Sequence, residues 1–139
     1  MYLLDTNVVS ELRKGRTRRV HPAVQRWADS VDDRTLYLSA ITVLELEIGI
    51  LQLLRKDATA GAVLRGWLRQ FVLPSFADRI LPIDADTALR CASLHIPESR
   101  PHYDALIAAT ALVHNMTVVT RNTADFAPTG VATLNPWEA

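Results

Sequence analysis

The chain has 139 residues, 49% of them hydrophobic and 22% charged, with 15 basic and 15 acidic side chains. This length suits one domain with a buried core, so we expect a single domain over residues 1–139. Zero net charge gives no overall field to attract a polyanion, so any contact with nucleic acid must be local. One cysteine excludes an internal disulfide and a multi-cysteine zinc site, and no apolar run suffices to cross a membrane. We therefore expect a cytoplasmic protein.

Short apolar segments alternate with helical patterns in the first half of the chain. The elements expected there are a strand at 2–4, a helix from Thr6 or Asn7 to about Gly15, a helix at about 22–31, a strand at 36–38, a helix at 42–54 and a helix from about 60 to 71. Pro22 suits the first turn of the second helix.

The second half of the chain continues the alternation. The elements expected there are a strand at 79–83, a helix capped by Asp84 and running to about Leu94, a loop at 96–102, a helix at 103–114, a strand at 116–120 and a strand at 131–134. Such alternation predicts an α/β fold, with a parallel sheet covered by helices on both faces. Ligands of these sheets gather beyond the carboxyl ends of the strands.

Two aspartates occur where the pattern predicts buried surface. Asp5 ends the first strand, where it either caps the next helix or points into the crevice. Asp104 shares a helical stripe with Ile107, Ala108 and Ala111. A buried, unpaired carboxylate there needs a cation, a metal or several donors, because leaving it bare is costly. An N-cap role near the helix start is the alternative for Asp104.

Glu45 has two interpretations. The segment Thr42-Val43-Leu44-Glu45 matches a capping box, which would make Glu45 structural. Glu45 also shares a face with Ile41, Ile48 and Gly49, and Gly49 would allow a close backbone approach. The neighbouring acid Glu47 points well away from that face and is expected to be solvated.

Polar residues follow the strand expected at 116–120. Asn122 could orient a metal-bound water or supply an oxygen ligand, and Asp125 offers a nearby charge, although a polar turn that caps a short helix is equally consistent. Together the acids of three separate elements are predicted to meet in one crevice. Carboxylate oxygens suit magnesium or manganese, and a divalent cation relieves the repulsion between them. Phosphodiester hydrolysis is the chemistry that such a site performs best.

A basic segment and three tryptophans are the other notable features. The basic segment is a phosphate-binding patch or a solvated loop, and its cations are Arg13, Lys14, Arg16, Arg18 and Arg19. Trp27, Trp67 and Trp137 are better explained as core or interface anchors than as a platform for base stacking.

Several blocks of sequence occur together in one order: residues 3–11, 38–46 with Gly49, 104–111, 119–122 and 134–137. In these blocks the chain resembles PIN-domain proteins of the VapC toxin family, especially the FitB-like branch. The resemblance implies a three-layer α/β/α domain with a short, mostly parallel central sheet. It also implies a magnesium- or manganese-dependent ribonuclease.

The resemblance assigns roles to residues of this chain. The metal-binding acids fall on Asp5, Glu45 and Asp104. The fourth catalytic position, often an aspartate in this branch, falls on Asn122, which removes one charge, and Asp125 is the alternative for that position. The hydroxyls that would donate to the acids, or to bound water, belong to Thr6 and Thr120.

The resemblance also implies partners. These are an RNA substrate and a VapB- or FitA-like antitoxin, which would provide the only route to DNA. A homodimer is expected, with a heterotetramer or larger assembly when antitoxin is bound. Residues 46–54 with Leu64, Trp67 and Leu68 would form a dimer or antitoxin surface, or else plain core.

Two other functions remain open from the sequence. One is a catalytically weak PIN-domain subunit that acts mainly by binding its DNA-binding antitoxin, and Asn122 favours it. The other is an aspartyl-phosphate protein built on Asp5, which the chain disfavours because Arg121, rather than a lysine, follows Thr120.

Overall fold

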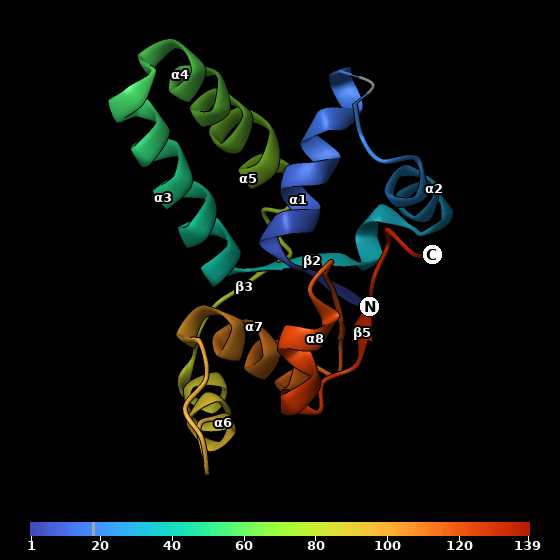
Figure 1. The fold of residues 1–139 in the computed structure, drawn as a ribbon, viewed down its shortest axis with the longest axis vertical. Coiled ribbons are helices and arrows are strands. Elements are labelled where there is room, and N and C mark those ends of the chain that lie inside the picture. The colour runs from blue at the N-terminus through green and yellow to red at the C-terminus, as the bar shows by residue number, and fades with distance from the viewer. Residues whose placement is uncertain (18) are drawn as a thin grey trace.

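The computed structural model describes residues 1–17 and 19–139. Its centre is a parallel five-stranded sheet in the order β3-β2-β1-β4-β5 (Figure 1). The strands are β1 (Tyr2–Leu4), β2 (Leu36–Ser39), β3 (Ile80–Leu81), β4 (Thr117–Val119) and β5 (Thr133–Leu134). The chain moves outward from β1 to β2 and β3, then returns to place β4 on the other side of β1. The predicted α/β class with a parallel sheet is confirmed.

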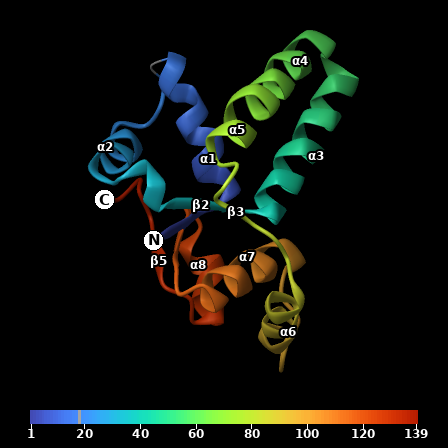
Figure 2. The ribbon, with the colours of Figure 1, turned by 180° about the vertical axis from the view of Figure 1, so that it is seen from behind.

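Helices cover both faces of the sheet, as the two opposite views in Figures 1 and 2 show. On one face lie α1 (Thr6–Arg13), α2 (Pro22–Ser30), α3 (Ala40–Lys56), α4 (Ala58–Trp67) and α5 (Leu73–Ser75). On the other lie α6 (Ala85–Leu94), α7 (His102–Val113) and α8 (Thr123–Phe126). Short 3-10 turns occupy Lys14–Thr17, Asp33–Thr35 and Ala127–Thr129.

The two cores follow from the alternation of side chains along each strand. Leu4 and Val119 pack against α1, α2 and α3, whereas their neighbours Leu3 and Val118 pack against α7 and α8. Phe126 of α8 is fully buried in the second core. The central strands β1, β2 and β4 contribute side chains to both cores, so the sheet packs against helices on each of its faces.

The α3–α4 region differs from the sequence predictions in three details, of which the cap of α3 is a prediction that was wrong. Ser39, not Thr42, caps α3: its hydroxyl accepts a hydrogen bond from the amide of Ile41, so Glu45 is no part of a capping box. The helix expected over 60–71 is regular only to Trp67, and Leu68–Val72 is a π-helical turn. Gly49 has open space around it; the close approach occurs at Gly61, where a Cβ would lie 2.6 Å from the side chain of Leu54.

The apolar surface predicted on α3 and α4 divides between core and exterior. Leu46, Ile50 and Leu68 are buried in the first core, as the plain core alternative requires. Exposed apolar side chains in this region belong to Leu44, Leu51, Val63 and Phe71. Among the described residues no helix is both long and apolar enough to span a membrane.

Candidate active site

Asp5 sits where β1 ends, beside β4, at the carboxyl edge of the sheet. It caps α1, because its Oδ1 accepts a hydrogen bond from the Thr6 amide at 2.8 Å. Its Oδ2 accepts from the Thr120 hydroxyl at 2.8 Å and from the Asn7 amide group at 3.3 Å. Its exposed fraction is only 6%. Of the two roles that the sequence offered for Asp5, capping is confirmed, and the role in a crevice stays a prediction.

Glu45 reaches the same edge from the second turn of α3. Its Oε1 accepts a hydrogen bond from the Thr6 hydroxyl at 3.0 Å, which links α3 to the start of α1. Glu47, expected to be solvated, instead pairs with Arg69 at 3.3 Å, and its other oxygen is buried without a hydrogen-bond partner. The two acids of α3 therefore differ in kind: one faces the carboxyl edge and the other faces the next helix.

Asp104 and Asp125 each lie in the first turn of a helix that begins near this edge. Asp104 is the third residue of α7 and half-buried; Pro101 occupies the N-cap position, so the N-cap alternative for Asp104 was wrong. Asp125 is the third residue of α8 and exposed. Asn122 is exposed, and its side chain makes no cap hydrogen bond, while its backbone amide donates to the Thr120 hydroxyl.

The four carboxylates form one electrostatic group, which we call the acidic cluster: Asp5, Glu45, Asp104 and Asp125. Burial is the main cause that raises the pKa of Asp5, and the charge of Asp125 raises it further despite the hydrogen bonds from its neighbours. Burial also raises the pKa of Glu45, with added repulsion from Asp5 and Asp104. The pKa of Asp104 is raised by burial and then by the charges of Asp5 and Asp125.

The acidic cluster carries negative charge that the protein does not neutralise. None of the ion pairs formed by residues 1–17 and 19–139 includes a member of the cluster. The donors that reach Asp5 and Glu45 are hydroxyls, an amide side chain and a backbone amide, all of them neutral. Mutually repelling carboxylates of this kind suit a hard divalent cation.

The carboxylates of the acidic cluster nevertheless do not form a complete metal-coordination site. Across the described part of the chain, no group of three or more His, Cys, Asp or Glu side chains is arranged to hold an ion. Asp5, Glu45 and Asp104 were predicted to share one ion. Their charges are coupled, but their carboxylate oxygens are not arranged around a common point. A bound divalent cation would offset the repulsion between these carboxylates.

The sequence interpretation missed the role of Asn7. Its side-chain amide donates to Asp5 and, at 3.4 Å, to the Thr120 hydroxyl, and its Oδ1 accepts from the Arg121 backbone amide at 3.3 Å. Asn7 therefore ties the start of α1 to the end of β4. A polar residue two positions after Asp5 was the available signal, but its partners lie more than a hundred residues away in sequence.

The structure describes part of the predicted basic segment, and two of the described cations contact other side chains. Arg18 and the side chain of Arg16 lie outside the described residues. Lys14 pairs with Glu11 at 3.1 Å, while the guanidinium of Arg13 lies 6.0 Å from the centre of the Trp67 ring. Arg19 is exposed.

A cavity of about 540 Å³ opens next to this segment, between α1 and the α4–α5 region. Its walls are mainly apolar and aromatic, and they include Leu12, Arg13, Trp67, Phe71 and Phe76. No member of the acidic cluster lines it. The acidic cluster and this cavity are therefore separate features on the two sides of α1.

Comparison with known proteins places this geometry in a family. The family model described as the PIN domain matches residues 2–130. The chain belongs to the PIN-domain family. Its acidic cluster therefore lies in a fold already suggested by the blocks of sequence around Asp5, Glu45 and Asp104.

Relatives and solved structures support this assignment over the full length of the PIN-domain chain. It is 43% identical to the Toxin FitB of Neisseria gonorrhoeae over 99% of both chains. It is 39% identical to the VapC ribonuclease Y4jK of Sinorhizobium fredii, again over 99% of both. The crystal structure of FitAcB from Neisseria gonorrhoeae covers all of both chains with a TM-score of 0.88 at 40% identity. The predicted three-layer PIN fold is confirmed.

Proposed function

We propose that this protein is a metal-dependent endoribonuclease, the toxin of a toxin–antitoxin pair, acting in the bacterial cytoplasm. The observation that carries the proposal is the acidic cluster at the carboxyl edge of the sheet, whose charges are coupled and unneutralised, with Asp5 buried and Glu45 and Asp104 partly buried. Similarity to a VapC ribonuclease and to the Toxin FitB supports the reaction and the biological setting.

The donor set fits magnesium or manganese, because it consists of carboxylate oxygens without sulfur or imidazole. Asp5, Glu45 and Asp104 would hold the ion, with Asp125 as the fourth acidic group. Asp125 is preferred over Asn122, because the charge of Asp125 acts on both Asp5 and Asp104 while Asn122 is exposed and neutral. When bound, a divalent ion supplies an activated water and stabilises the leaving oxygen of a phosphodiester.

The protein's own part in the reaction is to fix the acids. Asp5 is held by donors from Thr6, Asn7 and Thr120, so its carboxylate cannot rotate freely. Thr6 uses its hydroxyl to fix Glu45 as well. Such outer partners keep ligand carboxylates oriented, and losing one typically costs about 10- to 100-fold in metal affinity or activity.

The proposed partners are RNA as substrate and a DNA-binding antitoxin as inhibitor. The solved neighbours include a complex of FitAB with a DNA fragment, at 40% identity and a TM-score of 0.86. Contact with DNA would then occur only through the antitoxin. We also propose a homodimer, for which Leu44, Leu51 and Val63 offer exposed apolar surface.

The test is RNA cleavage by the purified chain, free of antitoxin, with added magnesium or manganese. Asp5→Asn keeps the size and one acceptor of the side chain but removes its charge, so cleavage should be abolished while the fold is kept. Asp86→Asn makes the same change in the first turn of α6, away from the acidic cluster, and should cut like the parent. Full activity of Asp5→Asn would remove the proposed mechanism.

A second candidate is a catalytically weak subunit that works mainly by binding its antitoxin. The neutral side chain of Asn122, at a position where an acid is expected, favours it. Failure of the parent chain to cut RNA or to bind manganese at neutral pH would select this candidate.

A further inference from the structure

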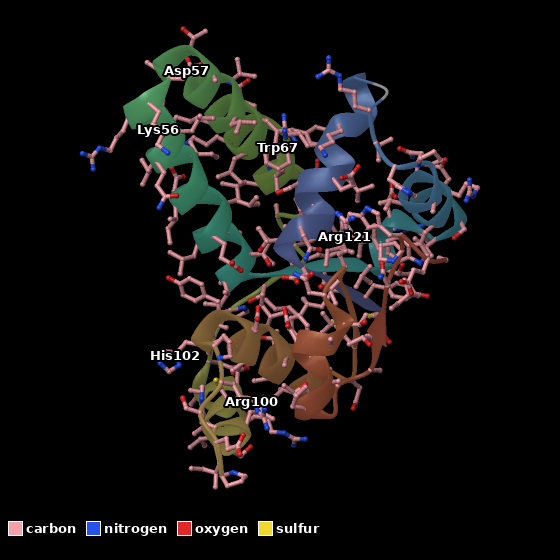
Figure 3. The ribbon with its side chains drawn as sticks, in the orientation of Figure 1. Lys56, Asp57, Trp67, Arg100, His102 and Arg121 are labelled. Carbon is pink, nitrogen blue, oxygen red and sulfur yellow. The ribbon has the colours of Figure 1, made fainter. Side chains whose placement is uncertain are left out.

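Arg121 is an exposed cation at the carboxyl edge that the proposed chemistry does not use. It directly follows Thr120, whose hydroxyl donates to Asp5. Figure 3 shows it beside α1 in the middle of the molecule, far from the tip of the α3–α4 hairpin where Lys56 and Asp57 lie. None of the ion pairs within the described residues includes Arg121. Its charge is therefore available to a ligand.

The backbone of Arg121 is fixed from two sides. Its amide donates to the side chain of Asn7, which also donates to Asp5. Its carbonyl accepts a hydrogen bond from the side chain of Asn135 at 3.4 Å. The same Asn135 accepts from the amide of Trp137 at 2.9 Å. Arg121 is thus held between the active-site edge and the last residues of the chain.

The side chain of Arg121 is held as well. Its guanidinium carbon lies 5.2 Å from the centre of the Trp137 ring, and Trp137 is partly buried and packs against the first core. An arginine that lies over an aromatic ring keeps its N–H groups free at the edge of the guanidinium plane. Those groups match the oxygens of a phosphate.

The substrate needs such a cation. The protein has no net charge, and the acidic cluster repels a phosphate backbone, so RNA must be attracted by individual basic side chains. We propose that Arg121 binds a backbone phosphate of the RNA beside the acidic cluster, and that Trp137 positions its guanidinium for this contact. The proposal rests on the ribonuclease function proposed above. It also gives a role to the Asn135-Pro136-Trp137 ending, which the acidic cluster leaves without one.

The experiment measures binding without cleavage. The Asp5→Asn chain, expected not to cut, is titrated against a short fluorescent single-stranded RNA of mixed sequence at several salt concentrations. Adding Arg121→Gln should raise the Kd on the order of tenfold at low salt, because a charge-assisted contact is lost. It should also lower the slope of log K against log salt by about 0.7, the value for one phosphate contact on a single strand. Arg90→Gln, an equal loss of charge on the exposed face of α6, should change neither.

The proposal is overturned if Arg121→Gln changes the Kd and the salt slope no more than the control Arg90→Gln does. Absence of RNA binding by the Asp5→Asn chain would overturn it too. Cleavage is scored separately in chains with native Asp5, where Arg121→Gln should raise KM and leave kcat nearly unchanged. Failure of the ribonuclease proposal appears as a parent chain that does not cut RNA with added magnesium or manganese, and the binding comparison in the Asp5→Asn chain is unaffected by that result.

The positioning role of Trp137 has its own readout. Trp137→Leu should weaken RNA binding when Arg121 is present and have no further effect in the Arg121→Gln background. Its cost in thermal stability, by contrast, should be similar in both backgrounds, because the packing of Trp137 against the core does not depend on the guanidinium. Equal weakening of RNA binding in both backgrounds would contradict the positioning role.

Discussion

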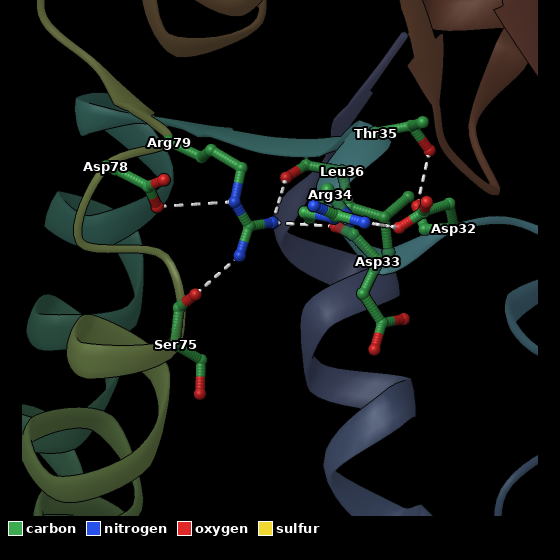
Figure 4. Close-up of polar contacts among 8 residues, drawn as sticks. All are labelled: Asp32, Asp33, Arg34, Thr35, Leu36, Ser75, Asp78 and Arg79. Carbon is green, nitrogen blue, oxygen red and sulfur yellow. Dashed lines mark hydrogen bonds and ion pairs between the residues drawn. The ribbon is translucent and has the colours of Figure 1, made fainter.

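Charged side chains at the two edges of the sheet differ in whether the protein itself supplies partners for them. At the amino end of β2, the guanidinium of Arg79 donates to the backbone carbonyls of Asp33, Leu36 and Ser75 at 2.6–2.8 Å and pairs with Asp78 at 3.4 Å (Figure 4). The guanidinium also lies 5.0 Å from the centre of the Phe76 ring.

At the carboxyl edge, by contrast, the charges of several carboxylates are coupled, and the groups that donate hydrogen bonds to Asp5 and Glu45 are all neutral. The comparison separates structural charge from functional charge. Arg79 is supplied with three backbone carbonyls from two separate segments of the chain, so it joins those segments and needs no ligand. The acidic cluster is left short of positive charge, which makes the folded protein less stable without a cation and ready to bind one. Substitutions at the two edges should therefore have opposite consequences for stability and activity.

The largest effect is expected at the carboxyl edge. Glu45→Gln should slow RNA cleavage by more than about 100-fold, the upper end of the cost of losing an outer partner of a metal ligand. The free energy of unfolding without metal should stay equal or increase, because one repelling charge is removed. Cleavage rates and urea unfolding check the two halves, with Glu98→Gln in the exposed loop before α7 as the control. Loss of stability without loss of activity would erase the contrast.

The next effect is expected at the opposite edge. Arg79→Met should lower the free energy of unfolding by about 2 kcal/mol, because three backbone carbonyls lose a charged donor. Arg34→Met should cost less than about 0.5 kcal/mol, since Arg34 is 87% exposed and its pair with Asp32 spans 3.8 Å. Urea unfolding measures both. A stable Arg79→Met chain that has lost metal binding would reverse the proposed division of roles.

The acidic cluster should make the stability of the metal-free protein depend on pH, and a bound metal ion should offset this effect. The pKa values of Asp5, Glu45 and Asp104 are raised, so the folded state binds protons more tightly than the unfolded state. Their contribution to stability is therefore greatest below the ordinary carboxyl pKa of about 4 and is lost as pH rises through the raised values. The lowered pKa values of Glu11 and Asp84 act in the opposite direction. The informative quantity is thus the difference between the parent and Asp5→Asn.

That difference should favour Asp5→Asn increasingly from about pH 4 to pH 7 in metal-free buffer. Manganese at ten times its Kd should add about 1.4 kcal/mol to the parent at pH 7 and little to Asp5→Asn. Thermal melts across pH, with and without manganese, measure both quantities. A difference that does not vary with pH would mean that the burial of Asp5 carries no charge penalty.

The smallest effect distinguishes Asp125 from Asn122. Asp125→Asn should weaken manganese binding by about threefold, because Asp125 is exposed and its charge acts on Asp5 and Asp104 through partly screened space. Asn122→Ala should change the affinity less. Calorimetric titration compares the two variants. A larger loss from Asn122→Ala would return the fourth position to Asn122.

The sequence was enough to predict what depends on periodicity and on the ends of elements. Parallel strands bring their carboxyl ends to one edge, so an acid after β1 and polar residues after β4 could be expected to meet there. What it could not predict depends on backbone positions in three dimensions. Three contacts join residues that only the completed fold brings together. They are the hydrogen bonds from Arg79 to backbone carbonyls, the hydrogen bonds of Asn7 to the end of β4, and the close approach between Gly61 and Leu54. The cap of α3 was wrong for a smaller reason, since Ser39 and Thr42 are both good capping residues.

The most direct test of this account is calorimetric titration of manganese into the metal-free protein at neutral pH. The account predicts binding that disappears in Asp5→Asn and in Asp104→Asn but persists in Asp86→Asn. It also predicts release of protons on binding, visible as a dependence of the heat on the ionisation enthalpy of the buffer, because the pKa values of the cluster are raised. No binding by the parent chain, or binding that Asp5→Asn and Asp104→Asn leave unchanged, would contradict it.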